Sequence, residues 1–244
     1  MRPDDASEIR ALPLFRDLRE ETFADLVTAG FLQRFPSGVT LIQERERADF
    51  LHIVTDGMVE MYAGTEGDET TLDLVQPLGT FILAAVLKDQ VYLQSARTIE
   101  KSRIVMIPAE KVRQAMSQDA AFMTAIVMEL AGGYRQAIRD LKNLKLRTGT
   151  ERLANWMLGQ AGEGNRVPLP CEKRVLASRL GMTPENLSRG FATLRAHGVV
   201  VSGNDIEITH RDALIRYARP DPLIDQREAD TRLTLGHHPG TAEA

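Results

Sequence analysis

The spacing of apolar residues changes twice along this chain. Residues 8–30 carry apolar side chains at helical spacing, which predicts short helices. From residue 31 to about 108 the apolar residues come in short β-rich runs separated by turn sequences, the pattern of a barrel or sandwich. Inside that region, residues 81–88 (FILAAVLK) are expected to form a helical turn against the sheets. Helical spacing returns beyond residue 108.

A long helix is predicted from Asp119, a favourable N-cap, to residue 146. Its apolar residues recur at alternating spacings of four and three, the a and d positions of a heptad repeat. Such a stripe packs on its own domain or forms a dimer seam. We interpret it as a parallel seam about 40 Å long, at roughly 1.5 Å per residue. The seam residues are Met123, Val127, Leu130, Tyr134, Ala137, Leu141 and Leu144.

The C-terminal third combines helices with a hairpin. A helix restarts near residue 150, with Thr148 or Thr150 as its cap, and a loop rich in Gly and Pro follows at 161–170. Two further helices come next, and then two short β runs joined by a Gly-Asn turn at 199–209 predict a β-hairpin. A last short helix at 210–219 ends the patterned part of the chain.

The two helices before the hairpin meet at a tight turn. Gly181 is expected to end the first helix in the left-handed conformation that glycine favours. Thr183 caps the second helix, and Pro184 lies in its first turn, where proline loses no hydrogen bond. Helix, tight turn, helix and hairpin together predict a winged helix-turn-helix.

Three polar residues share one face of the second helix, since Glu185, Ser188 and Arg189 stand at positions i, i+3 and i+4. Arginine can bond guanine O6 and N7, glutamate can accept from cytosine N4, and serine suits either partner. The alternative is an exposed Glu–Arg pair worth a few tenths of a kcal/mol. The capping, the turn, the wing and the basic neighbours, including Arg174, favour DNA reading. The residues expected at DNA are Thr183, Glu185, Asn186, Ser188, Arg189, Lys173, Arg179 and Arg195.

The charge distribution agrees with a small DNA-binding module on an acidic body. The whole chain has a net charge of −4, which argues against a generally basic nucleic-acid binder. Residues 171–219 nevertheless contain eight Lys or Arg against five Asp or Glu. Residues 220–244 contain two basic residues against five acidic ones. The basic excess therefore coincides with the predicted helix-turn-helix.

Composition excludes several other classes. No apolar run approaches the roughly 18 residues that cross a bilayer, and the first ten residues lack the apolar core of a secretory signal. We therefore expect a cytoplasmic protein without a membrane partner. The single cysteine, Cys171, cannot form an internal disulfide or supply the roughly four thiolates of an iron–sulfur cluster. Without a P-loop, G-x-S-x-G, H-E-x-x-H or zinc-spaced Cys/His set, the chain is not expected to be an enzyme.

The order of β-rich region, long helix, ERLANWML and winged helix with TPENLSR resembles the CRP/FNR transcription regulators over residues 10–219. Glu185, Ser188 and Arg189 are similar to the FNR branch, because Pro184 stands where the CRP branch has an extra arginine. This resemblance implies a TTGA-N6-TCAA palindrome, with Arg189 on guanine, Glu185 on the paired cytosine and Ser188 on a neighbouring thymine. The sequences of residues 31–42, 76–87 and 172–189 are similar to those of the FtrB subgroup.

The resemblance implies an α+β fold with four regions. They are a cyclic-nucleotide-binding-type β-roll, or double-stranded jelly roll, at 1–118; a dimerisation helix at 119–146; a winged helix-turn-helix at 147–219; and a flexible tail at 220–244. The implied partners are double-stranded DNA, RNA polymerase, a second copy of the chain and a small effector of unknown identity.

The residues that hold cyclic AMP in CRP-like relatives have no counterpart here. Leu83-Ala84 stands where a Gly-Glu pair would hold the ribose. Depending on register, Tyr92-Leu93 or Gln94-Ser95 stands where Arg-Ser would hold the phosphate. Arg97 is an odd number of residues from Tyr92 and from Gln94, so on a strand it is expected to face the other side. Because a buried phosphate without a cation is costly, we expect no cyclic nucleotide. The effector pocket expected instead is apolar, with Leu83, Ala84, Tyr92, Gln94 and Tyr134.

Haem is one alternative effector, because some relatives bind it and sense small gases. It needs an axial ligand, and His52 in the run FLHIV is the candidate, against a half-buried strand histidine with a hydrogen bond. His197 suits the end of the recognition helix, where a cation complements the dipole, and the pair His237-His238 forms a metal site or an unstructured pair. An apolar metabolite or no ligand stays open. So does a signalling module whose helix-turn-helix contacts protein.

Overall fold

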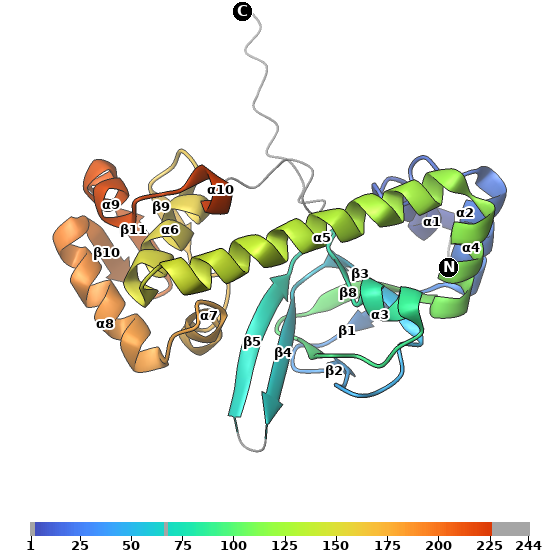
Figure 1. The fold of residues 1–244 in the computed structure, drawn as a ribbon, viewed down its shortest axis with the longest axis horizontal. Coiled ribbons are helices and arrows are strands. Elements are labelled where there is room, and N and C mark those ends of the chain that lie inside the picture. The colour runs from blue at the N-terminus through green and yellow to red at the C-terminus, as the bar shows by residue number, and fades with distance from the viewer. Residues whose placement is uncertain (1–2, 66–67, 226–244) are drawn as a thin grey trace, which may run out of the picture. The chain divides into compact units, whose positions relative to one another are not determined.

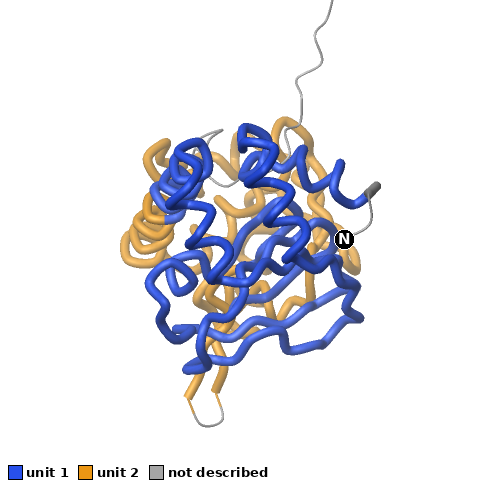
Figure 2. The backbone as a smooth tube through the Cα atoms, turned by 90° about the vertical axis from the view of Figure 1, so that its right-hand side faces the viewer, with its two compact units in different colours: residues 1–61, 74–133, 229–244 blue, residues 62–73, 134–228 orange. Residues whose placement is uncertain are grey.

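A computed structural model describes residues 3–65 and 68–225, which form two compact units (Figure 2). The first unit contains residues 3–61 and 74–133, and the second contains residues 62–65, 68–73 and 134–225. Each unit has its own hydrophobic core. Within the described ranges, no helix combines the length and apolar character that a bilayer crossing needs.

Eight strands form two four-stranded sheets with the orders β1-β8-β3-β6 and β2-β7-β4-β5 (Figure 1). The strands are β1 (Phe31–Phe35), β2 (Thr40–Ile42), β3 (Phe50–Asp56), β4 (Val59–Thr65), β5 (Asp68–Val75), β6 (Thr80–Phe81), β7 (Ser95–Thr98) and β8 (Ser102–Pro108). Strands that are distant in sequence are neighbours in both sheets, as a jelly roll requires. The predicted β-roll is therefore confirmed.

Two segments of the roll differ from the sequence prediction. The stretch expected as one helical turn divides at Ile82, whose φ of 68° separates β6 from helix α3 (Leu83–Lys88). Of the β-rich run 91–99 (VYLQSARTI), only Ser95–Thr98 forms a strand, and the preceding residues form loop contacts instead. Tyr92, for example, exchanges backbone hydrogen bonds with Arg45 and Glu46.

The long helix α5 (Ala120–Leu146) is continuous over 27 residues. Asp119 caps it as predicted, since its Oδ1 accepts from the amides of Ala121 at 3.0 Å and Phe122 at 3.3 Å. Phe122 and Ile126 join the core of the roll. The other helices of the first unit are α1 (Pro3–Arg10), α2 (Glu20–Ala29) and α4 (Ala109–Gln118).

The second unit contains the predicted winged helix-turn-helix. Thr148 caps its first helix through a capping box with Glu151. Its elements are α6 (Gly149–Ala161), β9 (Arg166–Pro168), α7 (Lys173–Arg179), α8 (Pro184–Leu194), the 3₁₀ turn η1 (Arg195–His197), β10 (Val199–Ser202), β11 (Asp205–Ile208) and α9 (Arg211–Ala218). Strand β9 lies in the expected Gly- and Pro-rich loop and pairs with β11, a long-range pairing that local composition did not indicate. Helix α8 is expected from its sequence to end near His197, but it ends at Leu194, and the 3₁₀ turn η1 follows.

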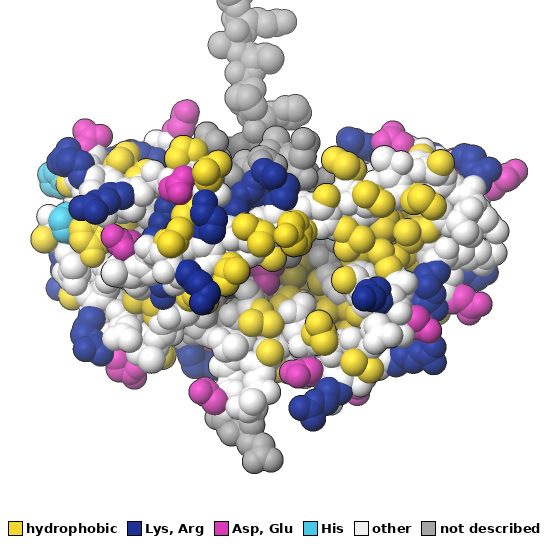
Figure 3. Space-filling view, in the orientation of Figure 1, with side chains coloured by type: hydrophobic (Ala, Val, Ile, Leu, Met, Phe, Trp, Pro, Cys, Tyr) yellow, Lys and Arg dark blue, Asp and Glu magenta, His cyan; other side chains and the backbone are white. Residues whose placement is uncertain are grey.

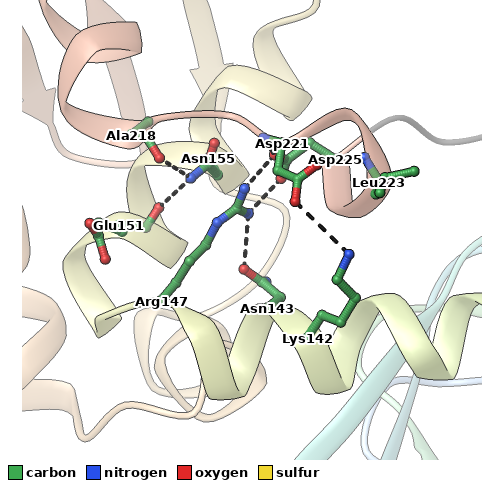
Figure 4. A network of polar contacts seen from close by, with 9 residues as sticks. All are labelled: Lys142, Asn143, Arg147, Glu151, Asn155, Ala218, Asp221, Leu223 and Asp225. Carbon is green, nitrogen blue, oxygen red and sulfur yellow. Dashed lines mark hydrogen bonds and ion pairs between the residues drawn. The ribbon is translucent and has the colours of Figure 1, made fainter.

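Part of the predicted flexible tail is folded. Residues Pro222–Asp225 form the short helix α10, and both carboxylate oxygens of Asp225 accept from Arg147, at 2.7 and 2.5 Å (Figure 4). Lys142 lies 3.9 Å from Asp221, so two residues of this segment face the end of α5. The bidentate pair orders a segment whose polar composition had suggested disorder. His237 and His238 lie outside the described residues.

Candidate nucleic-acid interface

The turn between α7 and α8 has the geometry that the sequence predicted. Gly181 has a φ of +62°, in the left-handed region where a side chain is strained. Its amide donates to Ser178 and the amide of Met182 donates to Ala177, so the last carbonyls of α7 are satisfied. The hydroxyl of Thr183 accepts from the amide of Asn186 at 3.2 Å, and Pro184 opens the helix. The start of α8 is thus fixed by local hydrogen bonds.

Helix α8 separates an apolar face from a polar one. Leu187, Gly190, Phe191 and Leu194 are buried in the core of the second unit. The exposed residues of the first two turns are Pro184, Glu185, Asn186, Ser188 and Arg189. The burial of one face leaves the polar face free for a partner.

The three residues expected to read bases differ in their local contacts. Hydrogen bonds from its own backbone amide and from the Thr183 hydroxyl lower the pKa of the Glu185 carboxyl, and Arg189 adds a smaller attraction. Glu185 is therefore an ionised acceptor at neutral pH, the form that suits an amino group. Among the described residues, the Arg189 guanidinium and the Ser188 hydroxyl have no hydrogen-bond partner. Their donors are available to an incoming molecule.

The basic neighbours divide into two groups. Lys173 and Arg174 begin α7, Arg195 follows α8, and all three are exposed as expected. Arg179 differs, because its Nη2 lies 3.1 Å from Asp73 on β5 and 3.6 Å from Asp140 on α5. A phosphate contact by Arg179 would have to replace both carboxylates. These partners could not be predicted from local sequence patterns, because both are distant along the chain.

The predicted seam on α5 is largely exposed in the single chain. Met123, Val127, Leu141 and Leu144 are each about half exposed, and Tyr134 is 70% exposed. Figure 3 shows hydrophobic side chains gathered along the course of this helix. Leu130 instead packs partly against the core of the roll, so it serves its own domain at least in part. Met128, Ile138 and Leu146 add exposed apolar surface that the heptad did not include.

The residues expected to form an effector pocket are not in one environment. Leu83 and Tyr92 are buried in the core of the roll, Gln94 is half-buried, and Ala84 and Tyr134 are exposed. Tyr134 also belongs to the second unit. The core positions are therefore filled with apolar side chains rather than lined with polar groups.

The same region does not fit a cyclic nucleotide. The guanidinium of Arg97 pairs with Glu60 at 2.8 Å, and the hydroxyl of Ser95 already accepts from the amide of Glu44 at 2.9 Å. The positions aligned with the ribose and phosphate contacts, Leu83-Ala84 and Gln94, supply no charge. A phosphate buried here would lack the cation it requires.

His52 is more buried than the expected half-buried strand histidine. It is 1% exposed, its ring stacks on Phe81 with a centroid distance of 5.0 Å, and Phe50 lies edge-on at 6.4 Å. Burial lowers its pKa to about 4, with a weaker opposing effect from the backbone of Phe50. Neither ring nitrogen forms a hydrogen bond with a described residue. Haem bound to His52 would have to displace core aromatic rings, so this packing does not fit an axial ligand.

The described residues also contain no group of three or more His, Cys, Asp or Glu side chains placed to hold a metal ion. Sequence reasoning missed one polar network. Arg152 on α6 is buried and donates to carbonyls at the end of α5 and in the α7–α8 turn. A basic residue directly before the buried run 153–155 is the signal that could have indicated it.

Comparison with known proteins agrees with this architecture. A model of the cyclic nucleotide-binding domain matches residues 32–119, and a model of the Crp-like helix-turn-helix domain matches residues 151–217. A candidate cyclic nucleotide binding protein of known structure from Ruegeria pomeroyi is 30% identical, with a TM-score of 0.59, over 90% of this chain and 100% of that one. The chain belongs to the CRP/FNR family.

Two other members illustrate the range of this family. The CRP-like cAMP-activated global transcriptional regulator of Mycobacterium tuberculosis is 24% identical over 194 residues, which are 76% of this chain and 87% of that protein. A candidate CRP/FNR regulator from Eubacterium rectale is 19% identical, with a TM-score of 0.69 over 85% of this chain and 98% of that one, which supports the fold alone. CRP/FNR proteins are transcription regulators rather than enzymes, and this member has their DNA-binding helix-turn-helix. Its FtrB-like subgroup stays a prediction.

Proposed function

We propose that this CRP/FNR regulator binds as a homodimer to a TTGA-N6-TCAA palindrome. The exposed polar face of α8 carries the proposal, because Glu185, Ser188 and Arg189 lie together on the first turns of a capped helix. In winged modules this end of the helix enters the major groove. Arg189 bonds guanine, ionised Glu185 accepts from the paired cytosine, and Ser188 contacts a neighbouring thymine. Lys173, Arg174 and Arg195 contact phosphates.

The apolar stripe of α5 supports the dimer. Exposed leucine, valine and tyrosine side chains on one long helix gain free energy when a second copy covers them. A parallel pair of α5 helices makes a two-fold axis, and a palindrome has the same symmetry. A regulator of this kind works with RNA polymerase at a promoter. The effector, where one acts, is apolar rather than a cyclic nucleotide.

The first experiment compares three duplexes: the intact palindrome, one with both TTGA halves scrambled, and one with a single intact half. We expect the purified chain to bind the intact palindrome most tightly, with one dimer per duplex by light scattering. Affinity should fall steeply with salt, because phosphate contacts release counterions. Equal affinity for intact and scrambled duplexes would contradict the base assignment. Salt-independent binding would favour a helix-turn-helix that contacts protein.

A further inference from the structure

Arg152 is a buried cation that pairs with no carboxylate among the described residues. It is 8% exposed, and burial lowers the pKa of its guanidinium from the ordinary value. Its donors reach four backbone carbonyls. Nε donates to Leu180 at 2.7 Å, Nη1 donates to Arg147 at 2.7 Å and Leu144 at 3.4 Å, and Nη2 donates to Gly181 at 3.1 Å. One side chain thus joins residues 144–147 to residues 180–181.

The four carbonyls lie at the ends of two helices. Leu144 is in the last turn of α5 and Arg147 directly follows that helix, while Leu180 and Gly181 cap α7. The last carbonyls of a helix have no partner within it and carry partial negative charge. Two helix ends therefore compensate the charge of Arg152, and Arg152 donates to carbonyls that have no partner within their own helices.

Packing joins the same two segments. A Cβ atom on Gly181 would lie 2.8 Å from Cδ1 of Leu144, so the end of α5 directly contacts the turn. The side chain of Met182 lies against Gly149 at the start of α6 and near Gly190 on α8. Helix α8 begins directly after this turn, at its cap Thr183. The orientation of α8 therefore depends on how the turn is held.

We propose that Arg152 is a positioning residue for DNA reading, which fastens the last turn of α5 to the turn before α8. A displacement of the end of α5 then moves the recognition helix with it, instead of being absorbed by the turn. The further step, that such a displacement changes the distance between two recognition helices, rests on the proposed dimer. The link between α5 and the turn is a property of each chain alone.

Two variants and a matched control separate positioning from stability. Arg152→Met keeps an unbranched side chain but removes every donor, and Arg152→Lys keeps the charge but donates from a single nitrogen. The control is Asn155→Ala. Asn155 is also buried on α6, at 7% exposure, and donates to a backbone carbonyl, that of Ala218 on α9, at 2.7 Å. Its side-chain amide donates to the carbonyls of Glu151 and Ala218 rather than to the turn.

The first readout is amide hydrogen exchange of the full chain without DNA. Arg152→Met should raise exchange at 143–147 and 181–187 together, Arg152→Lys should raise it less, and Asn155→Ala should leave 181–187 as in the wild type. Wild-type exchange at 181–187 in Arg152→Met would overturn the proposal. If Arg152→Met does not fold, Arg152→Lys decides the question by the same comparison.

The second readout uses the duplex that the wild-type chain enriches from a random-sequence pool, with a shuffled duplex as reference. Well below every unfolding midpoint, Arg152→Met should lose about tenfold in affinity for the enriched duplex and little for the shuffled one. Asn155→Ala should lower the midpoint and keep the wild-type ratio of affinities. A wild-type ratio in Arg152→Met would overturn the proposal. A wild-type chain that enriches no duplex contradicts the proposed function, whereas the exchange comparison still decides the α5–turn link.

Discussion

The two units of this regulator differ in how they use polar side chains. The helix-turn-helix exposes Glu185, Ser188 and Arg189 on a rigid helix, where they incur little desolvation before DNA arrives. The roll places apolar Leu83 and Tyr92 in its core, at positions where cyclic-nucleotide binders need polar groups. The second unit thus presents polar groups on its surface, whereas the roll fills its interior with apolar side chains.

Substitutions on the proposed dimer seam of α5 should have the largest effect on DNA affinity. Val127→Glu with Leu141→Glu places charges on the proposed seam of α5, and the dimer should dissociate in light scattering. Because a monomer binds only one half-site, affinity for the palindrome should fall on the order of a hundredfold or more. Met128→Glu is the matched control, since Met128 is an exposed apolar residue outside the heptad positions. A dimer that survives the double variant but not Met128→Glu would move the seam to another face.

Arg189→Ala tests the DNA-reading face. Loss of the guanidinium should cost on the order of 1–3 kcal/mol of discrimination at one base pair, because the bidentate guanine contact disappears. Competition between duplexes that differ at that base pair measures the loss. Lys173→Ala should instead weaken all duplexes alike and reduce the salt slope by about one. An unchanged ratio of palindrome to random affinity in Arg189→Ala would remove Arg189 from base reading.

His52 should give the roll a pH-dependent stability. The folded-state pKa is about 4 against an ordinary value of 6.5, so between these values the unfolded chain binds more protons. The free energy of unfolding should therefore fall as the pH drops from 6.5 to 4, by about 1.4 kcal/mol per pH unit from this group. His52→Leu should flatten that part of a urea-denaturation profile. Phe81→Leu, which keeps the histidine, should lower stability without removing the slope.

Cyclic AMP should produce no effect. A ligand that binds the native state raises the unfolding midpoint, and the described positions Leu83, Ala84 and Gln94 carry no charge to hold a phosphate, while nearby Arg97 is paired with Glu60. Thermal unfolding with and without excess cyclic AMP should therefore coincide. A saturable rise in the midpoint would show that the region around Leu83 and Gln94 rearranges to accept the nucleotide.

Local rules accounted for much of the fold. Apolar spacing predicted the strand at 31–35 and the long helix, and turn chemistry placed Gly181, Thr183 and Pro184 correctly. Features that depend on distant partners were missed. Strand β9 forms only because β11 is beside it, and α10 is held by Arg147.

Among the site residues, too, features set by the local sequence could be predicted, and features that depend on distant partners could not. Exposure on α8 could be predicted from helical periodicity alone, because one face of an amphipathic helix is buried. The pairing of Arg179 with Asp73 and Asp140 could not, because it joins three separate elements. Nor did the sequence show that His52 lies between Phe50 and Phe81, which decides against an axial ligand.

Arg152 on α6 and Arg179 on α7 should respond differently to the solution. Backbone carbonyls do not titrate at any cellular pH, so the contacts of Arg152 persist in acid and in concentrated salt. Arg179 is partly exposed and depends on two carboxylates, and salt screens such ion pairs. A high salt concentration should therefore weaken the contacts of Arg179 with Asp73 and Asp140 more than the contacts of Arg152 with backbone carbonyls.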